Sequence, residues 1–126
     1  PPEPRVTLAA ASGAPPGAVT GIRFGMHPDS TRVVLDVSAV TPFRSMVQTD
    51  SRTIIVELPG TRWNTTPEGS VVRTAPPIAF HAAATPDGTR LTLIGRDDIR
   101  IRQAAAFPPE GARGHRIVID VARTTP

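Results

Sequence analysis

The residues of this chain that could do chemistry are mostly arginines and acids spaced along strand-like segments. Arg32 and Asp36 lie four residues apart in one alternating run, and Arg116 and Asp120 repeat that spacing near the end of the chain. Residues four apart on a strand project from the same face. Four further arginines lie on other strand-like segments and are candidates for the same outward face: Arg23, Arg90, Arg100 and Arg102.

Two interpretations of these charged groups are open. Guanidinium groups offer forked donors that suit carboxylates and sugar oxygens, so outward arginines predict a binding face for a ligand that carries such groups. Alternatively, they are solvated charges that keep sheets from associating edge to edge and contribute little individually.

Trp63 is the only tryptophan and stands in an Arg-Trp-Asn-Thr-Thr stretch. It could stack on the apolar face of a pyranose ring, or it could cap one open end of the core. Large aromatic side chains dominate cores where there are few of them, which favours the cap.

Histidine gives no sign of catalysis or metal binding. His27, His81 and His115 fall in turns or at strand edges of different segments, without the spacing of a zinc site. No Gly-x-Ser-x-Gly elbow or phosphate loop is present. The absence of cysteine excludes disulfides and thiolate zinc sites. The sequence therefore predicts a chain that is not an enzyme by itself and holds no metal or cofactor.

Composition bounds the fold class. A chain of 126 residues fits one domain. Fifteen prolines and ten glycines are too many for a helical bundle but suit short strands joined by tight turns. The net charge of +3 is weak evidence for nucleic-acid binding, and no apolar run approaches the roughly 20 residues of a membrane-spanning helix. We expect an all-β domain that binds no nucleic acid and has no membrane-spanning segment.

Alternating apolar residues predict the same order of strands twice. The first set comprises a hairpin over 19–26 and 30–38, a short strand over 43–47 and a strand over 53–58. The second set comprises 78–82, 86–93, 99–102 and 116–121. Between them, residues 59–77 read as a connector with a short strand or helical turn at 70–74.

The two sets align when Pro28 is placed on Pro86. This superposes Arg23 on His81, Arg32 on Arg90 and Asp36 on Ile94. Neither set can bury its apolar face alone, so the simplest arrangement places the sheet of one half against the sheet of the other. We therefore predict a β-sandwich of two facing sheets with an internal pseudo-twofold repeat.

The ordered strand motifs resemble those of the AMIN domain. The resemblance is carried by Val19–Gly25, Ser30–Asp36, Arg52–Leu58 and Arg116–Val121, and covers roughly residues 19–122. It implies a non-catalytic periplasmic module that binds peptidoglycan and brings an attached N-acetylmuramoyl-L-alanine amidase to the division septum. The arginines would then hold peptide-stem carboxylates and glycan oxygens. The zinc-binding signature of such an amidase belongs to a separate domain and is absent here.

The resemblance leaves the parent protein open. The parent could be an amidase, in which case the partners are its catalytic domain and division proteins. Alternatively, the parent could be a type IV pilus secretin, in which this module would bind other proteins or anchor the secretin to the cell wall. We expect a Pro/Ala-rich leader, linker or edge strand over 1–17, the domain over 18–122 and the start of a linker over 123–126, with any signal peptide outside this sequence.

Overall fold

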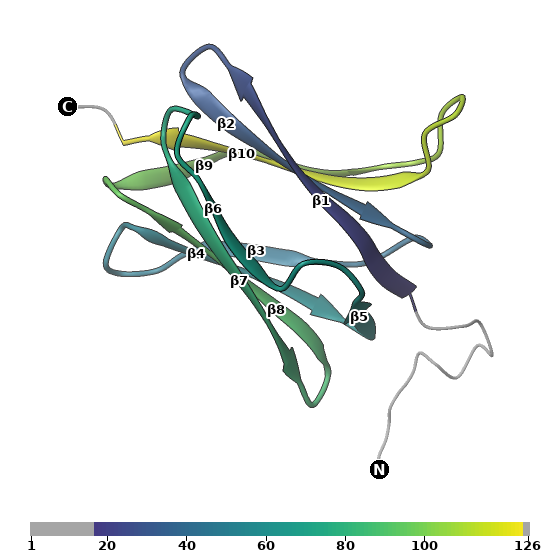
Figure 1. The fold of residues 1–126 in the computed structure, drawn as a ribbon. Coiled ribbons are helices and arrows are strands. Elements are labelled where there is room, and N and C mark those ends of the chain that lie inside the picture. The colour runs from purple at the N-terminus through teal and green to yellow at the C-terminus, as the bar shows by residue number, and fades with distance from the viewer. Residues whose placement is uncertain (1–16, 125–126) are drawn as a thin grey trace.

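The computed structural model describes residues 17–124, which form two facing five-stranded β-sheets, and no helix occurs within this range (Figure 1). The predicted all-β sandwich is confirmed. The expected leader lies outside the described residues except for Gly17, which begins the first strand, and residues 125–126 of the expected linker also lie outside them.

Each sheet has its own strand order. The first sheet runs β5 (Thr61–Trp63), β1 (Gly17–His27), β2 (Ser30–Val37), β10 (His115–Arg123) and β9 (Ile99–Phe107). The second sheet runs β3 (Arg44–Val47), β4 (Thr53–Pro59), β8 (Gly88–Gly95), β7 (Ile78–Thr85) and β6 (Glu68–Val71).

The repeat is present, but the two halves interlock. The hairpins β1–β2 and β7–β8 share one register after a shift of 58 positions, since Arg23 lies opposite Val34 and His81 lies opposite Thr92. The expectation of one sheet per half is wrong, because β3–β4 crosses to the second sheet and β9–β10 returns to the first. Side-chain alternation fixes which face of a strand is buried, not which strand lies beside it.

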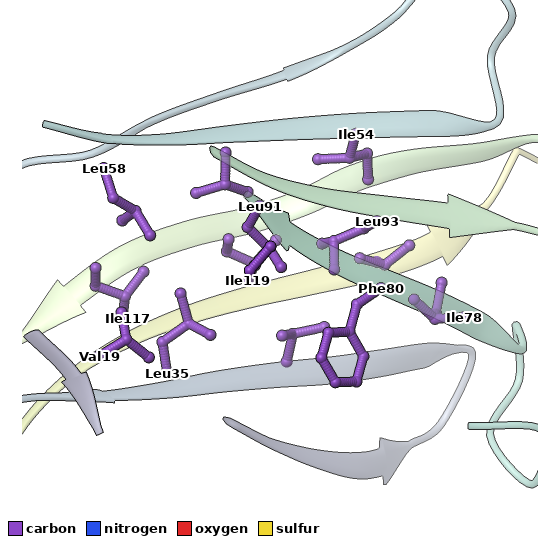
Figure 2. Close-up of a cluster of buried hydrophobic side chains, with 14 of the residues drawn as sticks. Val19, Leu35, Ile54, Leu58, Ile78, Phe80, Leu91, Leu93, Ile117 and Ile119 are labelled. Carbon is purple, nitrogen blue, oxygen red and sulfur yellow. The ribbon is translucent and has the colours of Figure 1, made fainter. Parts of the chain in front are cut away.

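The core is the set of inward residues that the alternation predicts. Figure 2 shows Leu35 and Ile119 of the first sheet facing Leu91 and Leu93 of the second, and all four are fully buried. Burying a side chain of this size contributes about 1.5–3 kcal/mol. These contacts hold the two sheets together and leave the outward residues free to form the faces described below.

Two buried threonines at equivalent positions fasten the connector to the strands. Thr31 Oγ1 donates to the carbonyl of Pro76 at 2.6 Å, and Thr89 Oγ1 donates to the carbonyl of Thr61 at 2.7 Å. The connector supplies an edge strand to each sheet: β5 pairs parallel with β1 and β6 pairs antiparallel with β7. The short strand expected at 70–74 therefore begins at Glu68 and ends at Val71.

Candidate ligand-binding faces

A bidentate ion pair lies at the centre of the outer face of the first sheet. Arg32 on β2 is directly opposite Asp120 on β10. Arg32 Nε lies 2.8 Å from Asp120 Oδ1 and Arg32 Nη2 lies 3.0 Å from Oδ2. This pair joins two strands that are distant in sequence, and Asp120 is buried with a side chain only 7% exposed. The interpretation as solvated charges therefore does not describe Asp120.

The charged neighbours of Asp120 shift its ionisation. The hydrogen bonds from Arg32 hold the pKa of Asp120 below its ordinary value, against the opposing effect of burial, and the positive charges of Arg32, His27 and Arg102 lower it further. The same hydrogen bonds raise the pKa of Arg32. Both groups are therefore charged at neutral pH, and their mutual pairing occupies both oxygens of the carboxylate.

A second bidentate pair lies nearer the β1 side of the same face. Arg23 Nε and Nη2 donate to the two oxygens of Asp36 at 2.9 and 2.8 Å. Gly21 lies opposite Asp36, and an added Cβ there would be only 3.1 Å from Asp36 Oδ2. The glycine thus leaves room for the carboxylate. Arg23 is largely exposed, so this pair is open to a ligand from solvent.

Arg116 occupies a different environment on the β9 side. It lies opposite Asp36 on one neighbouring strand and opposite Phe107 on the other. Its guanidinium carbon is 5.4 Å from the centre of the Phe107 ring, which is a cation–π geometry. The side chain is only 11% exposed, and Nη2 lies 3.8 Å from Glu110 Oε1 in the β9–β10 loop. Arg116 is thus a mostly buried cation with a distant acid.

The remaining arginines of the first sheet lie on β9. Arg100 is opposite Ala122, and Arg102 stands where the β9–β10 register shifts. Arg102 Nη1 donates to the carbonyl of Pro28 at 3.4 Å, and both side chains are exposed. The structure therefore places seven of the predicted residues on this one sheet: Arg23, Arg32, Asp36, Arg100, Arg102, Arg116 and Asp120.

The second sheet carries one of the predicted residues on its outer face. Arg90 Nε donates to Glu57 Oε2 at 2.7 Å, directly across β8 and β4. Around this pair the chemistry differs from the first sheet. Ile94, 44% exposed, stands where the first sheet has Asp36, and His81 contacts the exposed Glu68 at 3.3 Å.

Trp63 lies on the edge strand β5. Its indole Nε1 donates to the carbonyl of Thr66 at 2.8 Å, and its side chain packs against the buried core cluster. Trp63 therefore packs against the core at the β5 edge of the first sheet.

Three residues around these pairs were missed by the sequence reasoning. Glu57 could have been found, because it occupies the position of Asp120 when Ile54–Leu58 is placed on Ile117–Val121. Phe107 and Glu110 gave no signal, since one ends an alanine-rich strand and the other lies in a proline–glycine turn.

No metal centre is evident in the described range. The three histidines belong to β1, β7 and β10, and residues 17–124 contain no group of three potential metal ligands. Nor does this range include a helix with the length and apolar character needed to cross a membrane.

A comparison of the sequence with protein-family models identifies the family of this β-sandwich. The AMIN domain family matches residues 21–121, so the chain belongs to the AMIN domain family. AMIN domains are non-catalytic, periplasmic modules that bind peptidoglycan and target the proteins that contain them. A search of curated proteins found no match to this chain.

Proposed function

We propose that this domain binds peptidoglycan through the outer face of its first sheet and thereby brings a covalently linked N-acetylmuramoyl-L-alanine amidase to the division septum. The observation that carries the proposal is the collection of seven predicted residues on that sheet, contributed by β1, β2, β9 and β10. The binding itself needs no metal, cofactor or chemical step.

The chemistry of this face suits the polymer. Peptidoglycan presents carboxylates on its peptide stems and hydroxyl and amide oxygens on its glycan, and arginine donates to both kinds of acceptor. Arg23, Arg100 and Arg102 are the exposed arginines among the seven, so they are the groups that a polymer meets first.

Weak binding at one repeat is enough for targeting. The wall offers many identical sites, and a catalytic domain linked to this module is held near its substrate at a high effective concentration. The domain therefore acts by location, and the linked amidase would supply the cleavage reaction.

The specific alternative is a protein-interaction module of a type IV pilus secretin. The observation that favours it is the edge position of β9, a nine-residue strand on which a partner strand could add. The domain that follows in the full-length protein distinguishes the two: an α/β zinc domain supports the amidase, and further β modules support the secretin.

Retention on purified sacculi tests the proposal with two matched triple variants. Arg23→Ala/Arg100→Ala/Arg102→Ala removes three exposed cations from the first sheet, and Arg44→Ala/Arg73→Ala/Arg90→Ala removes three from elsewhere. We expect about a tenfold loss for the first variant, the equivalent of about 1.4 kcal/mol, and less than about threefold for the second.

The outcomes separate specific binding from general charge attraction. Equal losses for both variants, abolished by moderate salt, would indicate nonspecific attraction to an acidic polymer. Failure of the unaltered domain to be retained would rule out peptidoglycan binding. Retention without septal enrichment of a fluorescent fusion in dividing cells would reject only the division-site part.

A further inference from the structure

We propose that Arg116 is the receptor for a free carboxylate of the peptidoglycan peptide stem, and that Glu110 of the β9–β10 loop covers this receptor until the ligand replaces it. This inference rests on the proposed function and names the ligand group and the residue that recognises it.

The first observation is that Arg116 is mostly buried yet has unused hydrogen-bonding capacity. A guanidinium has five N–H donors, and a buried donor without an acceptor is costly. Arg116 Nε is buried and makes no hydrogen bond among the described residues. The Nη2–Oε1 separation of 3.8 Å to Glu110 is too long for a hydrogen bond. A carboxylate in the place of Glu110, at hydrogen-bond distance from Nη2, would supply an acceptor that the fold does not.

The second observation is that the neighbouring side chains hold the guanidinium but do not neutralise it. The guanidinium carbon lies over the ring of Phe107, a contact that holds the cation but supplies no carboxylate or carbonyl acceptor for its N–H groups. Asp36 lies opposite Arg116 on β2, but both of its oxygens accept hydrogen bonds from Arg23. Glu110 is therefore the acid that opposes the charge of Arg116, and the guanidinium loses this partner once Glu110 is replaced.

The third observation is the weak attachment of Glu110. Its side chain is 80% exposed, and it lies in a tight turn where it pairs with Arg113 and precedes Gly111, whose φ is +60°. An ion pair at 3.8 Å whose acid is largely exposed and makes no hydrogen bond to the cation contributes little, so a ligand carboxylate can replace Glu110 at small cost. Glu110 thus acts as an intramolecular competitor that carries the same chemical group as the ligand.

The second sheet has no equivalent receptor. When the strand β4 is aligned with β10, Thr53 takes the position of Arg116, and its hydroxyl donates to Asp50 at 2.8 Å. One domain therefore offers one such site, on the first sheet alone.

The test compares two soluble muropeptides, one with free stem carboxylates and one with those carboxylates converted to amides. Binding is measured by titration, together with the NMR signal of the Arg116 Nε–Hε group. We expect the free acid to bind at least about tenfold more tightly than the amide and to shift the Arg116 signal, because only a carboxylate offers two charged acceptors to the fork.

Two single variants define the roles of the residues. Glu110→Gln should tighten binding of the free-acid muropeptide by about two- to fivefold, because it removes the competing charge from an exposed position. Arg116→Lys should weaken it by about tenfold, because an ammonium lacks the planar fork. Glu110 is 80% exposed, so Glu110→Gln leaves the packing of the core unchanged. The comparison of the two ligands on the unaltered domain needs no variant that could fail to fold.

Equal affinity for the acid and the amide, or an Arg116 signal that does not move while binding occurs, would overturn the inference while leaving sacculus binding intact. Absence of binding to both muropeptides and to sacculi would instead reject the proposed function and this inference with it.

Discussion

The outer faces of the two sheets carry the same central ion pair in different surroundings. Arg32–Asp120 joins β2 to β10, and Arg90–Glu57 joins β8 to β4, at positions that the internal repeat makes equivalent. In both sheets the pair links strands from different halves of the chain. Its presence in both sheets indicates a role in holding the interlocked halves together.

Away from this pair the two faces diverge. The first sheet has Arg23 with Asp36 where the second has His81 and Ile94, and it has Arg116 where the second has Thr53. The second face consequently exposes apolar surface at one end, whereas the first exposes arginines. The comparison teaches that the repeat keeps the ion pair that joins strands of the two halves and varies the residues around it, which include those we propose to bind the ligand.

The largest expected difference between the faces is in stability. Asp120→Asn would leave the charge of Arg32 facing an uncharged amide at a position where the acid is only 7% exposed. It should lower the free energy of unfolding by about 2–3 kcal/mol, which is less than the loss of a fully buried partner because Arg32 is partly exposed. Glu57→Gln should cost less than about 1 kcal/mol, because Glu57 is 30% exposed.

Urea unfolding of both variants measures this difference, with an unchanged denaturant slope as the control for a common unfolded state. Losses of similar size would contradict the distinction and make the two pairs energetically equivalent.

A smaller effect is expected with acid. The folded-state pKa of Asp120 is held below its unfolded value of about 3.9, mainly by the hydrogen bonds from Arg32. Its contribution to stability is therefore fully present well above pH 4 and is lost as the pH falls through the folded-state pKa. The pKa of Asp50 is also lowered, by hydrogen bonds from the backbone N–H of Arg52 and from Thr53, and changes stability in the same direction.

Unfolding measured from pH 6 down to pH 2 checks this. Asp120→Asn should have a shallower acid dependence than the unaltered domain, and Glu57→Gln should retain the part that Asp120 contributes. An identical acid dependence in Asp120→Asn would show that the pair does not link folding to pH.

The smallest effect is expected from copying the Arg23–Asp36 pair into the second sheet. The double variant His81→Arg/Ile94→Asp places the same residue types at the same register and should gain a coupling of about 0.2–1 kcal/mol that weakens with salt. The two single variants complete the cycle that isolates the coupling. A coupling of zero would show that matching backbone register does not reproduce the side-chain pairing.

The strands and their buried faces could be predicted from the sequence, because the period of two is a local property. Val33 and Leu35 alternate with Arg32 and Val34, and the structure buries the first two completely. The equivalence of Pro28 and Pro86 also held in the hairpin registers. The family resemblance followed from these same segments and is confirmed over residues 21–121.

The partners of the charged groups could not be predicted in the same way. Arg32 and Asp36 share a face, but each is paired with a residue from another strand, because pairing depends on which strands become neighbours. The β1–β2 hairpin brings Arg23 to Asp36 and could be predicted, but the β2–β10 pairing that brings Asp120 to Arg32 depends on the crossing of β3–β4 to the opposite sheet, which has no local signature. The burial of Arg116 depends on the β9–β10 turn and on Phe107, and both come from outside its own strand.

The parallel course of β1 and β10 has a mechanical consequence. Both strands run antiparallel to β2, which lies between them, so the described chain enters the first sheet at Gly17 and leaves it near Arg123 at the opposite end (Figure 1). Tension between these points loads the hydrogen bonds of both ladders in shear, because those bonds lie perpendicular to the strands. These hydrogen bonds must then break together rather than one after another. The first sheet should therefore resist unfolding when force is applied between Gly17 and Arg123.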